Sequence, residues 1–169
     1  MAESTKGDAA IFPVDTRFQQ MARRPGGVPR ERALEGAQRH IDELKPEFNN
    51  WLSRELKELT VSIQQVASNP NDTAVLDRAH QACCQLRDVG GTMGYELVTF
   101  IADNFCEILD AIKAGATCDK NMIDCHMDAL ALARTDAYRN LRPEQVPEMT
   151  SGLRRMVELA LASSAREGK

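Results

Sequence analysis

Two helical patterns that meet at a glycine constrain the fold of this chain most strongly. The first pattern runs from Thr73 to about Met93, and the second begins at Glu96, just after Gly94. Small residues on the first apolar face would allow two helices to approach closely. We therefore predict neighbouring helices over 73–93 and 96–114, ended by Gly94 and Gly115 respectively. Their inward faces are predicted to be Leu76, Ala79, Cys83, Leu86 and Gly90, and then Leu97, Ile101, Phe105, Ile108 and Ile112.

Four more helices follow from the same spacing. Pro29 and Glu31 favour a helix start, and Pro46 allows a new helix to begin, so we expect one helix over 30–45 and a second to about Ser68. Others are expected over 120–140 and 146–165. Short loops join most of these segments, and no strand pattern is seen, which predicts an all-α fold: an up-and-down four-helix bundle with additional N- and C-terminal helices. The remaining predicted faces are Ala33, Ala37, Ile41 and Leu44; Phe48, Leu52, Leu56, Leu59, Ile63 and Val66; and Met149, Leu153, Met156, Val157 and Ala160.

Helix-breaking residues separate an N-terminal arm from the bundle. Pro13, Pro25, Gly26, Gly27 and Pro29 forbid a long helix before residue 30. We expect residues 1–29 to form a flexible arm, with one helical turn near 16–22, and residues 30–165 to form the helical domain.

Composition narrows the class of protein. A chain of 169 residues suits one domain, and its net charge of −4 argues against nucleic acid as a partner. We see no apolar run of the roughly 18–20 residues that a membrane helix needs, and no secretion signal. The five cysteines lack disulfide-framework spacing, which favours a reducing compartment. We expect a cytoplasmic monomer that binds neither nucleic acid nor membrane.

The break between the two central helices carries a recognisable motif. The run from Cys83 to Thr99 reads Cys-Cys-Gln-Leu-Arg-Asp-Val-Gly-Gly-Thr-Met-Gly-Tyr-Glu-Leu-Val-Thr. It resembles the signature of the histidine-phosphotransfer (HPt) family, in its bacterial stand-alone form. Segments 24–27, 47–52 and 101–109 resemble further parts of such proteins. The matching signature positions are Gly90, Gly91, Thr92, Gly94, Tyr95, Leu97, Val98 and Thr99.

The departures from this family fall where its chemistry would take place. The resemblance implies an exposed histidine that exchanges a phosphoryl group with the aspartate of a receiver domain. Cys84 stands at that histidine, Arg87 at a lysine, and Asp88 at a glycine that leaves room for the receiver. The helical period places Cys84 away from the buried face, so we expect it to be exposed. Asp88 would add a carboxylate that repels the acidic receiver site.

These observations predict a binding protein rather than an enzyme, without a cofactor. The chain would act as an adaptor or competitor that docks a response-regulator receiver domain or a hybrid histidine kinase without carrying phosphate. The predicted docking face consists of His80, Cys84, Gln85, Arg87, Asp88, Gly91 and Met93. Whether Val89, Met93 and Tyr95 form an exposed apolar patch beside it stays open.

Three other chemistries are compatible with these residues. His80 lies one turn before Cys84 and closer to the buried face, so we expect it to pack partly against the bundle at the edge of the core. It is also a fallback phosphate acceptor, and Cys84 could instead serve a redox-responsive adaptor. His80 and Cys84, spaced i and i+4, could also share a metal ion. No second paired motif in the sequence supplies further ligands, so no metal site is expected. His126 is expected to have a structural role.

Overall fold

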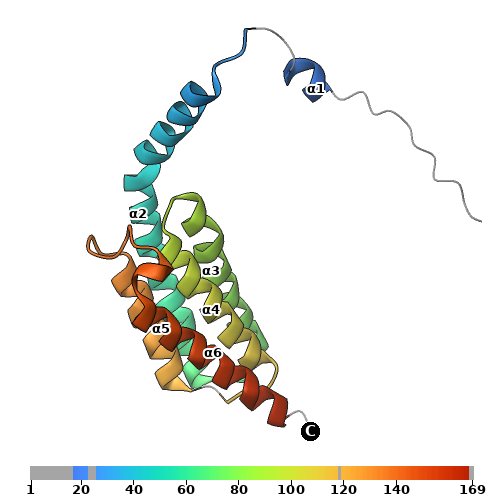
Figure 1. The fold of residues 1–169 in the computed structure, drawn as a ribbon. Helices are drawn as coiled ribbons and strands as arrows, with labels where there is room; N and C mark the ends of the chain where they lie inside the picture. Colours follow the sequence, from blue (N-terminus) through green and yellow to red (C-terminus); the bar gives the residue numbers. More distant parts are fainter. Residues whose placement is uncertain (1–16, 23–25, 118, 168–169) are drawn as a thin grey trace, which may run out of the picture. The chain divides into compact units, whose positions relative to one another are not determined.

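The described part of the chain is entirely helical. The computed structural model describes residues 17–22, 26–117 and 119–167. Within these ranges no strand occurs, as the all-α prediction requires. The helices are α1 (Arg17–Ala22), α2 (Arg30–Ser68), α3 (Thr73–Thr92), α4 (Glu96–Lys113), α5 (Lys120–Ala133) and α6 (Pro147–Glu167), with a 3-10 turn η1 (Pro143–Gln145) before the last (Figure 1).

The chain divides into two units, residues 1–40 and residues 41–169. The first unit holds α1 and the beginning of α2, and none of its side chains whose exposure is described is buried. Helix α1 lies where a single helical turn was expected. Residues 1–16 and 23–25 lie outside the described residues, so the flexibility of the arm stays a prediction.

The second unit is a helical bundle with one helix added on its outside. The part of α2 after residue 40 lies beside α3 and α5, α3 pairs with α4, and α6 packs against both α4 and α5 (Figure 1). Both predicted faces of α3 and α4 are buried, and so is the predicted face of α2 between Phe48 and Val66. On α6, Leu153, Val157 and Ala160 are buried, whereas Met149 and Met156 are half-buried.

Two predicted helix boundaries are wrong. Pro46 does not separate two helices, because α2 continues through it and the buried residues Phe48 and Leu52 directly after it anchor the helix in the core. Helix α5 ends at Ala133 instead of near Asn140, because the Thr135 hydroxyl donates to the Leu132 carbonyl at 2.8 Å and the backbone turns there.

The first predicted face of α2 is not part of the core. Ala33, Ala37 and Leu44 are exposed and Ile41 is half-buried. Apolar spacing therefore predicted the helix correctly but not its burial. Among the described residues, no helix has both the length and the apolar character needed to cross a membrane.

Candidate functional site

Helix α3 has a fixed start and a fixed buried face, and these two features decide which side chains point outward. The Asp72 carboxylate accepts from the backbone N–H groups of Ala74 and Val75, at 3.0 and 3.3 Å, and so caps the helix. Leu76, Cys83 and Leu86 are buried against the bundle. The opposite side of α3, with Gln85, Asp88 and Gly91 of the predicted docking face, therefore faces solvent.

The glycines of the motif have structural roles. Gly94 adopts a φ of +80°, and the Tyr95 N–H donates to the Gly90 carbonyl at 2.8 Å, which ends α3 in a Schellman-type turn. A Cβ on Gly90 would lie 2.8 Å from the hydroxyl oxygen of Thr99, so α3 and α4 approach closely here. That hydroxyl donates to the Arg87 carbonyl at 3.1 Å.

Tyr95 fastens the same turn to α2. It is buried, and its hydroxyl donates to the Asn49 side-chain oxygen at 2.6 Å. Its ring also contacts Phe48, with centroids 4.7 Å apart. The motif residues Gly90, Gly94 and Tyr95 are therefore accounted for by the packing of three helices, and Tyr95 is not part of an exposed patch.

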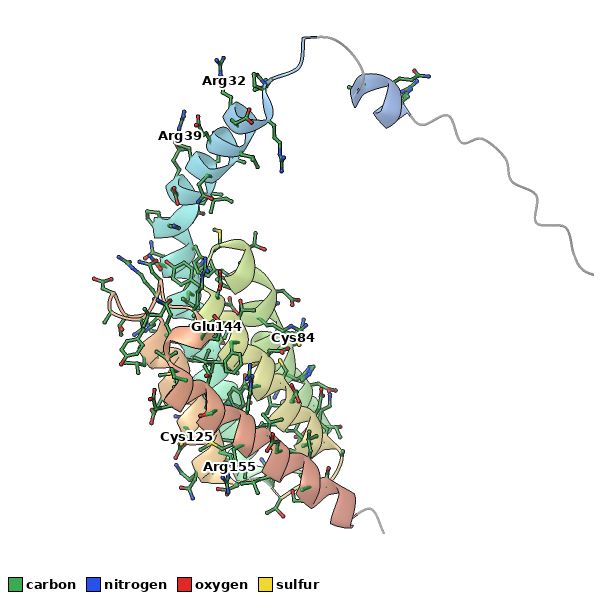
Figure 2. The ribbon with its side chains drawn as sticks, in the orientation of Figure 1. Arg32, Arg39, Cys84, Cys125, Glu144 and Arg155 are labelled. Atoms are coloured by element: carbon green, nitrogen blue, oxygen red, sulfur yellow. The ribbon has the colours of Figure 1, made fainter. Side chains whose placement is uncertain are left out.

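The structure places the seven docking-face residues along one side of α3 and its C-terminal end, with unequal exposure. Gln85, Asp88 and Gly91 are exposed, whereas His80, Cys84, Arg87 and Met93 are half-buried. The expectation that Cys84 would be exposed is therefore wrong in degree. Its sulfur is partly covered because it packs against α4, and Figure 2 shows it on the α3–α4 side of the bundle, far from Cys125 on α5.

Cys84 belongs to a cluster of thiols between α3 and α4. Its Sγ lies 3.6 Å from the Sγ of Cys106, a buried residue of α4. Burial and the hydrogen bond to Cys106 raise the pKa of the Cys84 thiol to about 11. Hydrogen bonds from the Cys83 and Cys84 thiols lower the pKa of the Cys106 thiol below its usual value. Cys84 is thus a protonated thiol at neutral pH and a poor nucleophile.

Both ring nitrogens of His80 have neighbours. Nε2 lies 3.2 Å from the Asp110 carboxylate, and Nδ1 lies 3.6 Å from the Cys84 sulfur. The side chain is 25% exposed, so it sits at the boundary between core and solvent, as the sequence predicted. A phosphoryl group could reach either nitrogen only by displacing one of these neighbours.

The charge of Arg87 is already engaged. Its Nε donates to Asp88 at 2.9 Å, and its Nη1 lies 3.6 Å from the Asp103 carboxylate. Two acidic groups therefore surround the one basic group of the docking face. The Asp88 side chain is 64% exposed, so its second carboxylate oxygen is available to repel an acidic partner.

An apolar hollow adjoins the docking face. It measures about 650 Å³ and lies between α2 and the C-terminal half of α3. Val89 and Leu44, which line it, are 36% and 48% exposed, and Met93 is half-buried. The other lining residues are Glu47, Phe48, Trp51, Arg54, Glu55 and Gln85.

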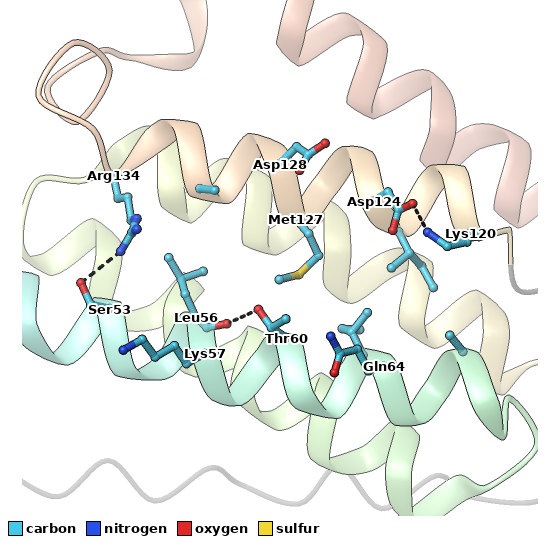
Figure 3. A pocket seen from close by; sticks show the side chains of 14 residues that line it. Ser53, Leu56, Lys57, Thr60, Gln64, Lys120, Asp124, Met127, Asp128 and Arg134 are labelled. Carbon is cyan, nitrogen blue, oxygen red and sulfur yellow. Dashed lines mark hydrogen bonds and ion pairs between the residues drawn. The ribbon is translucent and has the colours of Figure 1, made fainter.

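A second cavity, of about 590 Å³, lies elsewhere in the bundle between α2 and α5 (Figure 3). Met127 points into it, and Arg134 closes one end by donating to the Ser53 hydroxyl at 3.2 Å. Lys120 pairs with Asp124 near the other end. None of the predicted site residues lines this cavity.

His126 is wholly buried on α5. Its Nδ1 contacts the Met122 carbonyl at 2.8 Å, its ring stacks on Phe105, and Nε2 has no hydrogen-bond partner. Burial lowers the pKa of this imidazole below its usual value. This placement agrees with a structural role.

Sequence reasoning missed Cys106 and Asp110. They lie on α4 four residues apart, the same spacing as His80 and Cys84 on α3, and this shared spacing was the available signal. Comparisons of the chain with protein-family models, with curated proteins and with solved structures find no match. The resemblance to HPt proteins therefore depends only on residues of this sequence, namely the motif from Cys83 to Thr99 and segments 24–27, 47–52 and 101–109.

Proposed function

We propose that this chain is an HPt-like signalling protein of the bacterial cytoplasm. It docks a response-regulator receiver domain or a hybrid histidine kinase through α3 and carries no phosphate itself. It is a binding module, not an enzyme, and acts as an adaptor or as a competitor of active phosphotransfer proteins.

The observation that carries the proposal is the uncovered outer side of α3 with an apolar hollow beside it. Within the described residues of the bundle, α6 covers α4 and α5 and leaves the side with Gln85, Asp88 and Gly91 in solvent. Apolar surface next to a polar face is typical of a protein-docking site.

The same site supports docking without phosphotransfer. A thiol, Cys84, stands at the position where the resemblance implies histidine, and its sulfur faces Cys106. The basic group that would sit near a phosphoryl group, Arg87, is paired with Asp88 and Asp103. An incoming phosphoryl group would meet neither a free imidazole nor an unpaired positive charge here.

The test is a binding titration of the purified chain against receiver domains encoded beside its gene. We expect association, with Val89→Glu weakening it at least about tenfold, because a carboxylate in the hollow would have to be desolvated. Val61→Glu is the matched control, since Val61 is 51% exposed on α2 and does not line the hollow. If the chain binds none of these receivers, the proposal is contradicted.

A phosphotransfer assay with charged receivers, run in parallel, separates the alternatives. Binding without acid-labile label supports the adaptor. Label that disappears in His80→Ala would instead assign the function to transfer through His80. Binding that differs between reduced and peroxide-treated protein would favour the redox-responsive adaptor through Cys84.

A further inference from the structure

Two pairs of side chains with the same spacing face each other across the α3–α4 interface. His80 and Cys84 lie four residues apart on α3, and Cys106 and Asp110 lie four residues apart on α4. Residues four apart share one side of a helix, so each helix presents one pair to the other. The sequence analysis singled out only the first pair, and packing places the second pair opposite it.

Three potential ligand atoms of these side chains converge. One ring nitrogen of His80 and the sulfurs of Cys84 and Cys106 all lie within 4.8 Å of one another. Cys84 Sγ is 3.6 Å from His80 Nδ1 and 3.6 Å from Cys106 Sγ. A tetrahedral zinc site with Zn–S of about 2.3 Å and Zn–N of about 2.0–2.1 Å has S···S and S···N edges of about 3.8 and 3.5 Å. The two measured separations match those edges closely.

We propose that His80, Cys84 and Cys106 form a binding site for a thiophilic divalent cation, with Zn²⁺ as the natural ion. Two thiolates and one imidazole select such an ion over Mg²⁺ or Ca²⁺, which prefer oxygen ligands. Binding releases the two thiol protons, and no electron is transferred.

Asp110 has a different part in this site. Its carboxylate lies 3.2 Å from His80 Nε2, the ring nitrogen farther from the Cys84 sulfur. A histidine that ligates a metal through one nitrogen usually donates the other N–H to a carboxylate, which fixes the ring and raises its basicity. Asp110 is therefore a positioning residue, and Nδ1 is the ligand.

The three ligands are buried to different degrees, so an ion could enter from solvent at the rim and be held against the buried cysteine. Cys106 is 3% exposed, whereas His80 and Cys84 are half-buried at the rim of the interface. Three protein ligands leave a fourth coordination position for water or for a group from a partner. A disulfide between Cys84 and Cys106 would need the sulfurs to move together by about 1.5 Å, because an S–S bond is about 2.05 Å long. The two separations that meet at the Cys84 sulfur need no such movement to hold a metal ion.

The site does not depend on the proposed docking function, because the geometry of four side chains defines it. It can be tested on the full chain without any partner.

The experiment is a Co²⁺ titration of the reduced chain without oxygen, followed by displacement with Zn²⁺. The parent for all variants carries Cys118→Ser and Cys125→Ser. Cys125 is the exposed thiol of α5, and Cys118 lies outside the described residues. We expect one Co²⁺ per chain, with a thiolate-to-cobalt charge-transfer absorption that Zn²⁺ abolishes.

Variants assign the ligands. Cys84→Ser, Cys106→Ser and His80→Gln should each weaken Co²⁺ binding strongly, and each cysteine change should also reduce the charge-transfer absorption. Asp110→Asn should weaken binding about 10–100-fold, whereas Asp124→Asn, a control on α5, should leave it unchanged. Circular dichroism checks folding. If Cys106→Ser does not fold, the proposal is tested with Cys84→Ser and His80→Gln, which change half-buried side chains. A folded parent without charge-transfer absorption, or absorption unchanged in Cys84→Ser, overturns the proposal.

Discussion

At the scale of single residues, Gly90 sets how closely α3 and α4 can approach. Its missing side chain leaves room for the Thr99 hydroxyl, which a Cβ would meet at 2.8 Å. Thr99 cannot turn away at low cost, because it is β-branched and its hydroxyl donates to the Arg87 carbonyl. The close approach therefore depends on glycine at this position.

We expect Gly90→Ala to lower the free energy of unfolding by about 1–3 kcal/mol, the usual cost of overpacking. Gly152→Ala is the matched control: Gly152 lies within α6 with nothing near its Cβ position, so alanine should stabilise the protein by about 0.5–1 kcal/mol. Urea unfolding of both variants measures this. Equal effects of the two changes would contradict the close-packing argument.

His126 makes stability depend on pH. Burial keeps its folded-state pKa below the usual value of about 6.5, so between these two values the unfolded chain binds more protons. We expect the free energy of unfolding to fall as pH decreases below about 6.5, by at most about 1.4 kcal/mol per pH unit from this group. Urea unfolding between pH 5 and 7.5 should show a smaller slope in His126→Leu; identical slopes would exclude His126 as the cause.

At the scale of elements, α2 shows how a local rule can be overridden. Pro46 lacks the N–H that continues the helical ladder, a defect worth about 3 kcal/mol in a helix interior. The helix persists because Phe48 and Leu52, directly after it, are anchored in the core while Pro46 itself is exposed. Tertiary burial thus outweighs the local preference.

Pro46→Ala should therefore stabilise the protein, by about 1–2 kcal/mol after allowing for the greater freedom of the unfolded chain. Pro70, in the turn between α2 and α3, provides the contrast. There alanine should lower the free energy of unfolding by about 0.4–1 kcal/mol, because the folded turn gains no hydrogen bond and the unfolded chain gains conformational freedom. Chemical denaturation gives both values, and a destabilised Pro46→Ala would show that α2 requires the proline.

At the scale of the whole molecule, stability is concentrated in residues 41–169. None of the earlier residues whose exposure is described is buried, whereas α6 buries Leu153, Val157 and Ala160. Removal of residues 1–40 should change the free energy of unfolding by less than about 1 kcal/mol. Removal of α6 should cost roughly 3–6 kcal/mol from Leu153 and Val157 alone. Thermal and urea unfolding of the two truncated chains tests this, and a large loss with the first would contradict it.

The sequence by itself determined α3 and α4, their buried faces and their glycine stops. Leu76, Cys83 and Leu86 recur at the helical period, and Gly94 has the positive φ that a helix end favours, so these features follow from local rules. It also predicted that His80 would lie at the edge of the core. It did not predict the continuity of α2 through Pro46 or the end of α5 at Ala133.

Only the tertiary structure decided which residues of α4 meet those of α3. The period of one helix states which side chains share its face, but not which residues of a second helix lie opposite them. That register depends on how closely the backbones approach at Gly90 and on the turn held by Tyr95. For this reason the sequence showed Cys84 as an isolated, exposed substitution, whereas packing places it beside Cys106 and brings Asp110 to His80.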